Sequence, residues 1–106
     1  MKVYKFGGAS VRDAGGIRNL AVITAREKDK LVVVVSAFGK TTNALEQVLK
    51  TWMAGDESYR ELLDRIYDYH ESVACELFPS GNSAKGKIDN SFALLTMELA
   101  RRIMVV

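Results

Sequence analysis

The sequence is poor in the residues that build disulfides and metal sites. Its 106 residues include one cysteine, Cys75, and one histidine, His70. A single thiol cannot form an internal disulfide, and no set of Cys and His residues surrounds it. We interpret Cys75 as a small apolar residue on a helix. No acid–base partner for His70 is evident, so we interpret it as a helix-face residue rather than a catalytic one.

Strong net charge and long apolar runs are also missing. The chain has 15 Lys and Arg against 13 Asp and Glu, a formal net charge of +2, which is too small to indicate a nucleic-acid or membrane-surface partner. No apolar run approaches the roughly 18 residues that a membrane helix needs. The first apolar residues are interrupted by Lys5, glycines and Arg12, unlike those of a signal peptide. We therefore expect a cytoplasmic protein with no nucleic-acid and no membrane partner.

The first third of the chain has the pattern of a strand, a helix and a second strand. Residues 3–6 predict a strand, and apolar residues at helical spacing predict a helix over about 12–27. Residues 31–35 are five branched apolar residues, four of them β-branched, which predict a strand buried on both faces. Two strands joined by a crossover helix should be parallel, with a right-handed connection.

Two loops of interest follow these strands, at residues 7–10 and 36–43. Ligands of parallel sheets bind at the carboxyl ends of the strands. Both loops are therefore expected to face one crevice, which supports a site better than either loop alone.

The rest of the chain predicts helices. Thr41, Thr42 or Asn43 is the expected N-cap of one helix, and Gly55 ends it. A long helix should open at Asp56 or Ser58, and a turn at 78–83 should precede a last helix. Its apolar face would carry Ile88, Phe92, Leu95, Leu99 and Ile103.

The segment Lys5-Phe6-Gly7-Gly8-Ala9-Ser10-Val11 is the most informative part of the chain. Two glycines between a strand and a helix let backbone N–H groups approach an anion, and the helix N-terminus adds positive potential. Lys5 supplies a full positive charge. The alternative is a tight turn whose glycines serve backbone geometry alone.

These residues resemble the opening signature of the aspartokinases, within the amino-acid kinase superfamily. The usual fifth residue of that signature is Thr, whereas this chain has Ala9 there, which lacks the hydroxyl. A second, ordered motif strengthens the resemblance: a Val-rich strand, then Ser36-Ala37, Gly39 and Thr42-Asn43. Gly39-Lys40-Thr41 is not a P-loop, because Val34 stands where that motif needs a glycine.

The resemblance implies an ATP-dependent phosphorylation of the β-carboxylate of L-aspartate, with ATP and Mg²⁺, at the start of lysine, threonine and methionine biosynthesis. Lys5 would be catalytic, and Thr42 and Ser36 would bind the substrate. No residue of this chain is assigned as a metal ligand. The residues expected to bind ATP phosphates are Lys5, Phe6, Gly7, Gly8, Ala9, Ser10 and Ser36.

The resemblance also implies an α/β fold: the N-terminal portion of a three-layer α/β/α sandwich, with a βαβ unit followed by a helical segment. We assign residues 1–54 to a phosphate and substrate half-site and 55–106 to a helical region, all within one N-terminal fragment (1–106). Later family segments that hold aspartate, nucleotide and metal are absent. We therefore expect this chain to be inactive alone, and its bare edges and helix faces to be covered by the rest of a longer protein or by another copy, as in a homo-oligomer.

Two alternatives remain open at this point. The chain is another amino-acid kinase, such as a glutamate or carbamate kinase, or it is a non-catalytic binding and assembly module that acts through its helices.

Overall fold

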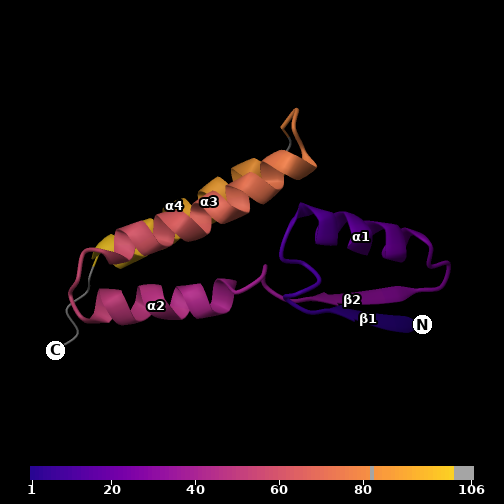
Figure 1. Ribbon diagram of the computed structural model, residues 1–106, viewed down its shortest axis with the longest axis horizontal. Coiled ribbons are helices and arrows are strands. Elements are labelled where there is room, and N and C mark those ends of the chain that lie inside the picture. The colour runs from indigo at the N-terminus through magenta and orange to yellow at the C-terminus, as the bar shows by residue number, and fades with distance from the viewer. Residues whose placement is uncertain (82, 102–106) are drawn as a thin grey trace. The chain divides into compact units, whose positions relative to one another are not determined.

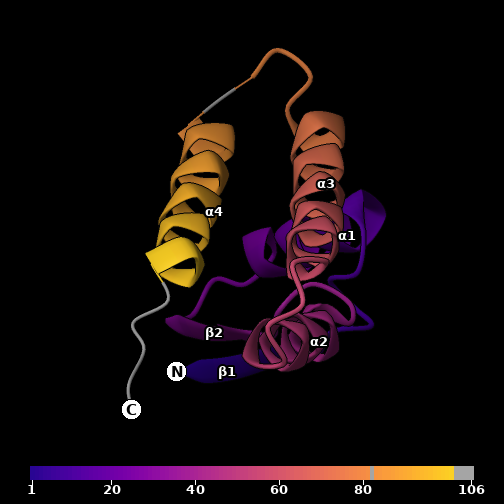
Figure 2. The same cartoon turned by 90° about the vertical axis from the view of Figure 1, so that its left-hand side faces the viewer.

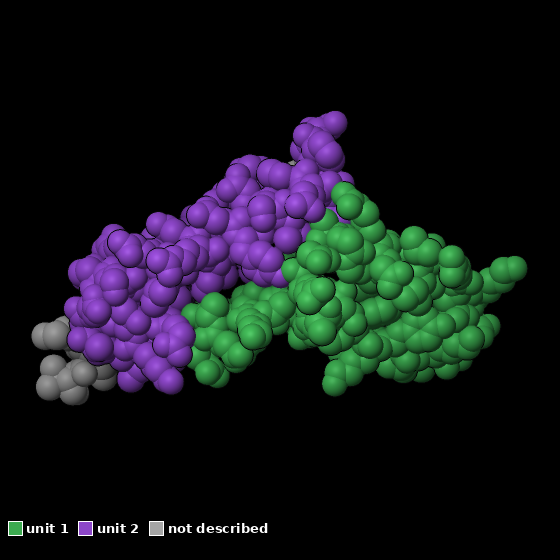
Figure 3. Space-filling model, in the orientation of Figure 1, with its two compact units in different colours: residues 1–46 green, residues 47–106 purple. Residues whose placement is uncertain are grey.

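The computed structural model describes residues 1–81 and 83–101 (Figure 1). Two compact units, residues 1–46 and 47–106, are coloured separately in Figure 3. The described residues form a small α/β structure with a two-stranded parallel sheet and four helices. The predicted order, a βαβ unit followed by helices, is confirmed for these residues. The predicted division at residues 54 and 55 stays a prediction.

The sheet of the first unit consists of β1 (Lys2–Phe6) and β2 (Leu31–Val35). The strands are parallel, as predicted, and the register runs from Lys2 opposite Leu31 to Phe6 opposite Val35. A backbone hydrogen bond from Ser36 N to Phe6 O, 2.9 Å long, continues the ladder beyond the last strand residues. The chain segments that follow β1 and β2 therefore leave the sheet at the same edge.

Helix α1 (Ala14–Ala25) begins two residues later than predicted. Asp13 is in an extended conformation and its Oδ1 accepts a hydrogen bond from Gly16 N at 2.8 Å. This is an N-cap, which satisfies one of the N–H groups that have no partner inside the helix. The side-chain cap, rather than the charge of Asp13 alone, sets where α1 starts.

Helix α1 lies along one face of the sheet (Figure 1). Tyr4 on β1 donates its hydroxyl to Glu27 Oε2 at 2.5 Å, and Lys2 Nζ lies 3.2 Å from the same oxygen. Val11 and Ala14, just before and at the start of α1, are each only 1% exposed. The helix is thus attached to the sheet at both of its ends.

The predicted burial of the second strand on both faces is wrong for the described chain. Val32, Val33, Val34 and Val35 are 37–48% exposed. The physical reason is that two strands and one covering helix leave the outer edges and the second face without neighbours. The branched side chains favour the strand conformation all the same, because that preference is local.

Helix α2 (Thr41–Met53) contains all three residues expected to cap it, so that N-cap assignment is wrong. The residues expected as caps are already helical because a tight turn precedes them: Thr41 N and Thr41 Oγ1 both donate to Phe38 O, at 3.0 and 2.5 Å. The predicted end is confirmed. Gly55 has φ +76°, and the N–H groups of Gly55 and Asp56 bond to the carbonyls of Trp52 and Thr51, the hydrogen-bond pattern of a Schellman cap.

In the second unit, α3 (Tyr59–Leu77) and α4 (Ser83–Arg101) lie side by side (Figure 2). The opening of α3 agrees with the prediction, because Ser58 is its N-cap residue. The ring of Phe92 on α4 lies between Tyr67 and His70 of α3, with centroids 5.4 and 5.7 Å away. Ring packing of this kind adds to simple burial. His70, predicted as a helix-face residue, therefore lies on the face of α3 that packs against α4.

Polar contacts also join the helices of this unit. Trp52 Nε1 donates to Leu99 O at 2.8 Å, which connects the end of α2 to α4. Tyr67 Oη donates to Asp89 Oδ1 at 2.5 Å, and this bond together with Lys85 holds the pKa of Asp89 below its usual range. Ile103, predicted on the last helix, and the apolar end 104–106 lie outside the described residues. Among those described, no helix combines the length and apolar character that a membrane span requires.

The attachment of α1 through Glu27 makes a pH-dependent prediction. The hydrogen bonds from Tyr4, the Asp29 backbone and Lys2 lower the pKa of Glu27 from 4.5 to about 2. Because folding lowers this pKa, ionised Glu27 stabilises the folded state above about pH 4.5, and the stabilisation is lost as the pH falls towards 2 and Glu27 is protonated. We expect Glu27→Gln to lower the thermal midpoint at pH 7 and to match the wild type near pH 2.

The measurement is thermal unfolding of both chains at steps between pH 7 and pH 2. Glu46→Gln, at an exposed position on α2, is the matched control and should show no such convergence. A constant difference between Glu27→Gln and wild type across the whole pH range would contradict the assignment.

Candidate functional site

The candidate site lies where the two strands end. The loop that follows β1 and the loop that follows β2 come into direct contact in the first unit. A Cβ atom built on Gly8 would lie 2.7 Å from Gly39 O and 3.5 Å from Ala37 O. The two motifs singled out from the sequence are therefore neighbours in space, as the parallel topology predicted.

The first loop is a tight turn. Ser10 N donates to Gly7 O at 3.0 Å, so Gly7, Gly8, Ala9 and Ser10 form a hydrogen-bonded turn. Within residues 1–81 and 83–101, no acceptor is found for the backbone N–H groups of Gly7, Gly8 and Ala9. Three successive N–H groups that have no acceptor among the described residues are available as donors to an anion.

The two glycines of this turn are needed for different reasons. Neither has a positive φ, so neither is required for left-handed backbone geometry. Gly7 has no atom within 4 Å of the place where a Cβ would stand, which leaves that side open to a ligand. Gly8 is required by space, because the Gly39 carbonyl occupies the position of its side chain.

Lys5 and Ser36 emerge on one face of the sheet. Lys5 is exposed, whereas its neighbours Tyr4 and Phe6 are partly buried on the face that carries α1. The register pairs Lys5 with Val34, two residues before Ser36. Because side chains alternate along a strand, Lys5 and Ser36 belong to the face opposite α1. No hydrogen bond or ion pair joins Lys5 to any described residue, so its charge is available to a ligand.

The other predicted residues surround this edge in different ways. The ring of Phe6 packs edge-to-face on Tyr4, with ring centroids 6.5 Å apart. The carbonyl of Phe6 accepts the hydrogen bond from Ser36 N that continues the sheet ladder. Ala9 and Ser10 are exposed on the turn. Thr42 is exposed in the first turn of α2, next to the buried Thr41. Lys40, in the loop that follows β2, is also exposed.

Comparison with known proteins assigns the chain to a family. Residues 1–99 match the model of the amino acid kinase family. This chain belongs to the amino acid kinase family. No solved structure matches it.

Several relatives of this amino acid kinase chain carry aspartokinase in their names. A chloroplastic bifunctional aspartokinase/homoserine dehydrogenase 1 of Zea mays is 32% identical over 84 residues, which are 78% of this chain and 9% of that protein. Aspartokinase 2 of Bacillus subtilis (strain 168) is 36% identical over 87 residues, 79% of this chain and 21% of that protein. The predicted similarity to the aspartokinases is confirmed. The chain spans only 9% and 21% of the length of these two relatives.

Three residues support the site through contacts that were not predicted from the sequence. Gly16 allows the loop to rest against α1, because a Cβ there would clash with the carbonyl oxygen of Ser10. Thr41 closes the second loop through its hydroxyl. Gly39, with φ +51°, turns its carbonyl towards Gly8. The Asp13–Gly16 spacing was a signal for Gly16, since the residue three after an N-cap lies against the incoming loop. The sequence did single out Gly39 as a motif glycine and Thr41 as a candidate cap, but it gave no signal for these two contacts.

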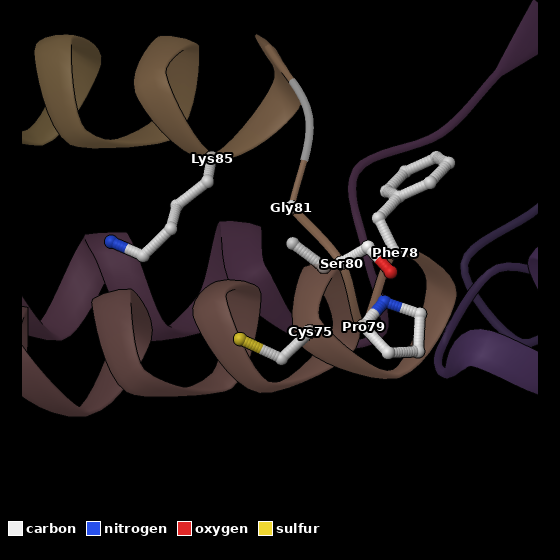
Figure 4. A pocket seen from close by; sticks show the side chains of 7 residues that line it. Cys75, Phe78, Pro79, Ser80, Gly81 and Lys85 are labelled. Atoms are coloured by element: carbon white, nitrogen blue, oxygen red, sulfur yellow. The ribbon is translucent and has the colours of Figure 1, made fainter.

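Outside this edge the described residues offer little chemistry. They contain no group of three or more His, Cys, Asp or Glu side chains that could hold a metal ion. A shallow hollow of about 310 Å³ lies in the second unit, around the end of α3 (Figure 4). Cys75 and Lys85 line it, but Lys85 pairs with Asp89 at 3.1 Å. It carries no motif predicted from the sequence.

The contact between the loops makes a prediction about stability. Gly8→Ala places a methyl group against a backbone carbonyl, which cannot move as a flexible side chain would. We expect a loss of about 1–3 kcal/mol in the free energy of unfolding, as for overpacking elsewhere. Gly7→Ala meets open space and is the matched control, with an expected change of about 0.5 kcal/mol or less.

Urea unfolding of the two variants beside the wild type measures both values. Equal stability of Gly8→Ala and Gly7→Ala would contradict the close approach of the two loops.

Proposed function

We propose that this chain is the phosphate-binding and substrate-binding beginning of an aspartate kinase domain. In this proposal the complete enzyme transfers the γ-phosphoryl group of ATP to the β-carboxylate of L-aspartate, the first step towards lysine, threonine and methionine. The observation that carries the proposal is the turn at residues 7–10. Its three N–H groups, which have no acceptor among the described residues, stand beside the loop that follows β2 at the same edge of the sheet. Family membership and the aspartokinase names of the relatives support it.

The chemistry fits such an edge. The carboxylate of aspartate is ionised at neutral pH, so the reaction needs no general base. The difficulty is to bring one anion to another, and catalysis then consists of positioning and charge neutralisation. N–H groups of Gly7, Gly8 and Ala9 would bind phosphate oxygens, and Lys5 would offset the charge of the transferring group.

The remaining assignments belong to the same proposal. Ser10 would add a hydroxyl contact, Ser36 would lie near the transferring group, and Thr42 would orient aspartate. Phe6 would support the turn through the ladder bond of its carbonyl. Mg²⁺ would accompany ATP, and since the described residues hold no cluster of metal ligands, its protein ligands would come from other segments of the kinase.

The proposal also extends the fold. The exposed valines of β2 fit a larger three-layer α/β/α sandwich, in which further strands and helices cover both faces. It includes the half-site at residues 1–54, the helical region at 55–106, association into a homo-oligomer, and a cytoplasmic enzyme. Without those further segments we expect the isolated chain to make no aspartyl phosphate.

The test of Lys5 uses a protein that carries this chain together with the rest of a kinase domain. Lys5→Ala should lower kcat about a hundredfold or more, because it removes charge stabilisation from the transition state. The thermal midpoint should be unchanged, since Lys5 has no partner in the described fold. Lys28→Ala, exposed at the far end of the sheet, is the control.

A coupled assay for aspartyl phosphate supplies kcat, and glutamate and carbamate replace aspartate in parallel reactions. Near-normal turnover of Lys5→Ala would remove Lys5 from the catalytic residues. Turnover with glutamate or carbamate alone would favour another amino-acid kinase. Absence of ATP turnover with every acceptor would favour a non-catalytic module.

A further inference from the structure

We propose that Gly39 is a positioning residue that couples the loop after β2 to the turn at residues 7–10. Its backbone conformation would determine where the N–H groups of that turn stand. The functional consequence rests on the proposed binding of phosphate by the turn, whereas the positioning itself does not.

The first support is the backbone of Gly39. Its φ is +51°, in the left-handed region. Glycine enters this region at no steric cost, Asn enters it more readily than most residues, and a β-branched residue there is an outlier. Substitutions at position 39 should therefore differ in effect according to how readily the new residue adopts a positive φ, and not only according to its size.

The second support is what the carbonyl of Gly39 touches. It occupies the space where a Gly8 side chain would stand, 2.7 Å from the built Cβ, and the Ala37 carbonyl borders the same space at 3.5 Å. Rotation of Gly39 out of the left-handed region would turn this carbonyl away from Gly8. The turn would then lose the surface against which it packs.

The third support is that the second loop is held on both sides of Gly39. Ser36 N bonds to Phe6 O at 2.9 Å, and Thr41 bonds to Phe38 O through both its N–H and its hydroxyl. With both ends held, the peptide of Gly39 is the part of the loop that meets Gly8. Any movement of the turn on binding an anion would therefore be transmitted to Gly39 and on to Thr42.

This coupling is reciprocal, because a change at one loop that alters binding at the other must act equally in reverse. Occupation of the turn by phosphate would favour one arrangement of the first turn of α2. The exposed Thr42, proposed to orient the acceptor substrate, belongs to that helical turn. Gly39 would thus link the two halves of the proposed site without touching either ligand.

The experiment compares three variants of the ¹⁵N-labelled chain by the amide resonances of Gly8 and Ala9. We expect Gly39→Val to shift both resonances and Gly39→Asn to leave them close to wild type. Gly55→Val is the matched control, because Gly55 also has a positive φ (+76°) with no atom within 4 Å of its Cβ position. It should leave Gly8 and Ala9 unchanged. If Gly39→Val does not fold, as judged by circular dichroism, Gly39→Ala replaces it in the same comparison.

Unchanged Gly8 and Ala9 resonances in Gly39→Val, or equal shifts in Gly55→Val, would overturn the positioning role. So would shifts in Gly39→Asn as large as those in Gly39→Val, because size rather than backbone conformation would then be the cause.

A titration with inorganic tripolyphosphate extends the test to function. We expect the Kd of Gly39→Val to be about fivefold weaker or more, within the usual range of coupling between sites, and that of Gly39→Asn to stay near wild type. If the wild-type chain binds no tripolyphosphate, the proposed phosphate site fails, and the amide shifts still decide the positioning role. Tripolyphosphate binding of equal strength in wild type and Gly39→Val would overturn the coupling.

Discussion

The parallel pairing of β1 with β2 is the constraint on which the candidate site depends. Antiparallel strands would send the two following loops to opposite edges, but parallel strands send them to the same one. The register, with Phe6 opposite Val35, brings Gly8 to within contact of Gly39 and continues through the Ser36–Phe6 bond. The proposed binding of phosphate and of substrate depends on these two loops sharing an edge.

In the first unit, two strands and one helix are enough to place the two loops at one edge of the sheet. Helix α1 covers one sheet face and is attached at its end by the hydrogen bonds of Glu27, and at its start by the buried Val11 and Ala14. The opposite face carries Lys5 and two of the exposed valines of β2, Val32 and Val34. One small sheet thus carries both a lysine that is available to a ligand and an exposed apolar strand that further elements could cover. Both features agree with a chain that spans 9% and 21% of two aspartokinase relatives.

The second unit is held by a different set of interactions. Its helices combine an aromatic group around Phe92 with polar bonds from Trp52 and Tyr67 that reach across to α4. Leu94 and Met97 of α4 remain more than 60% exposed, so this helix also presents apolar surface. Nothing in the described residues assigns chemistry to this unit, and family membership extends over most of it.

Local patterns in the sequence determined the kinds and order of the elements, the parallel strands and the two motifs. Strand and helix preferences, the cap at Asp13 and the turn at Gly55 depend on near neighbours, so they can be predicted from a short stretch of chain. The burial of β2 could not be predicted in this way, because it depends on how many other elements pack against the strand. Tertiary structure alone decided why Gly8 must be glycine and that Gly39 and Thr41 support the site. The contact between Gly8 and Gly39 joins residues about 30 positions apart, which no local pattern records, and the bonds from Thr41 to Phe38 matter only because they hold the loop that makes this contact.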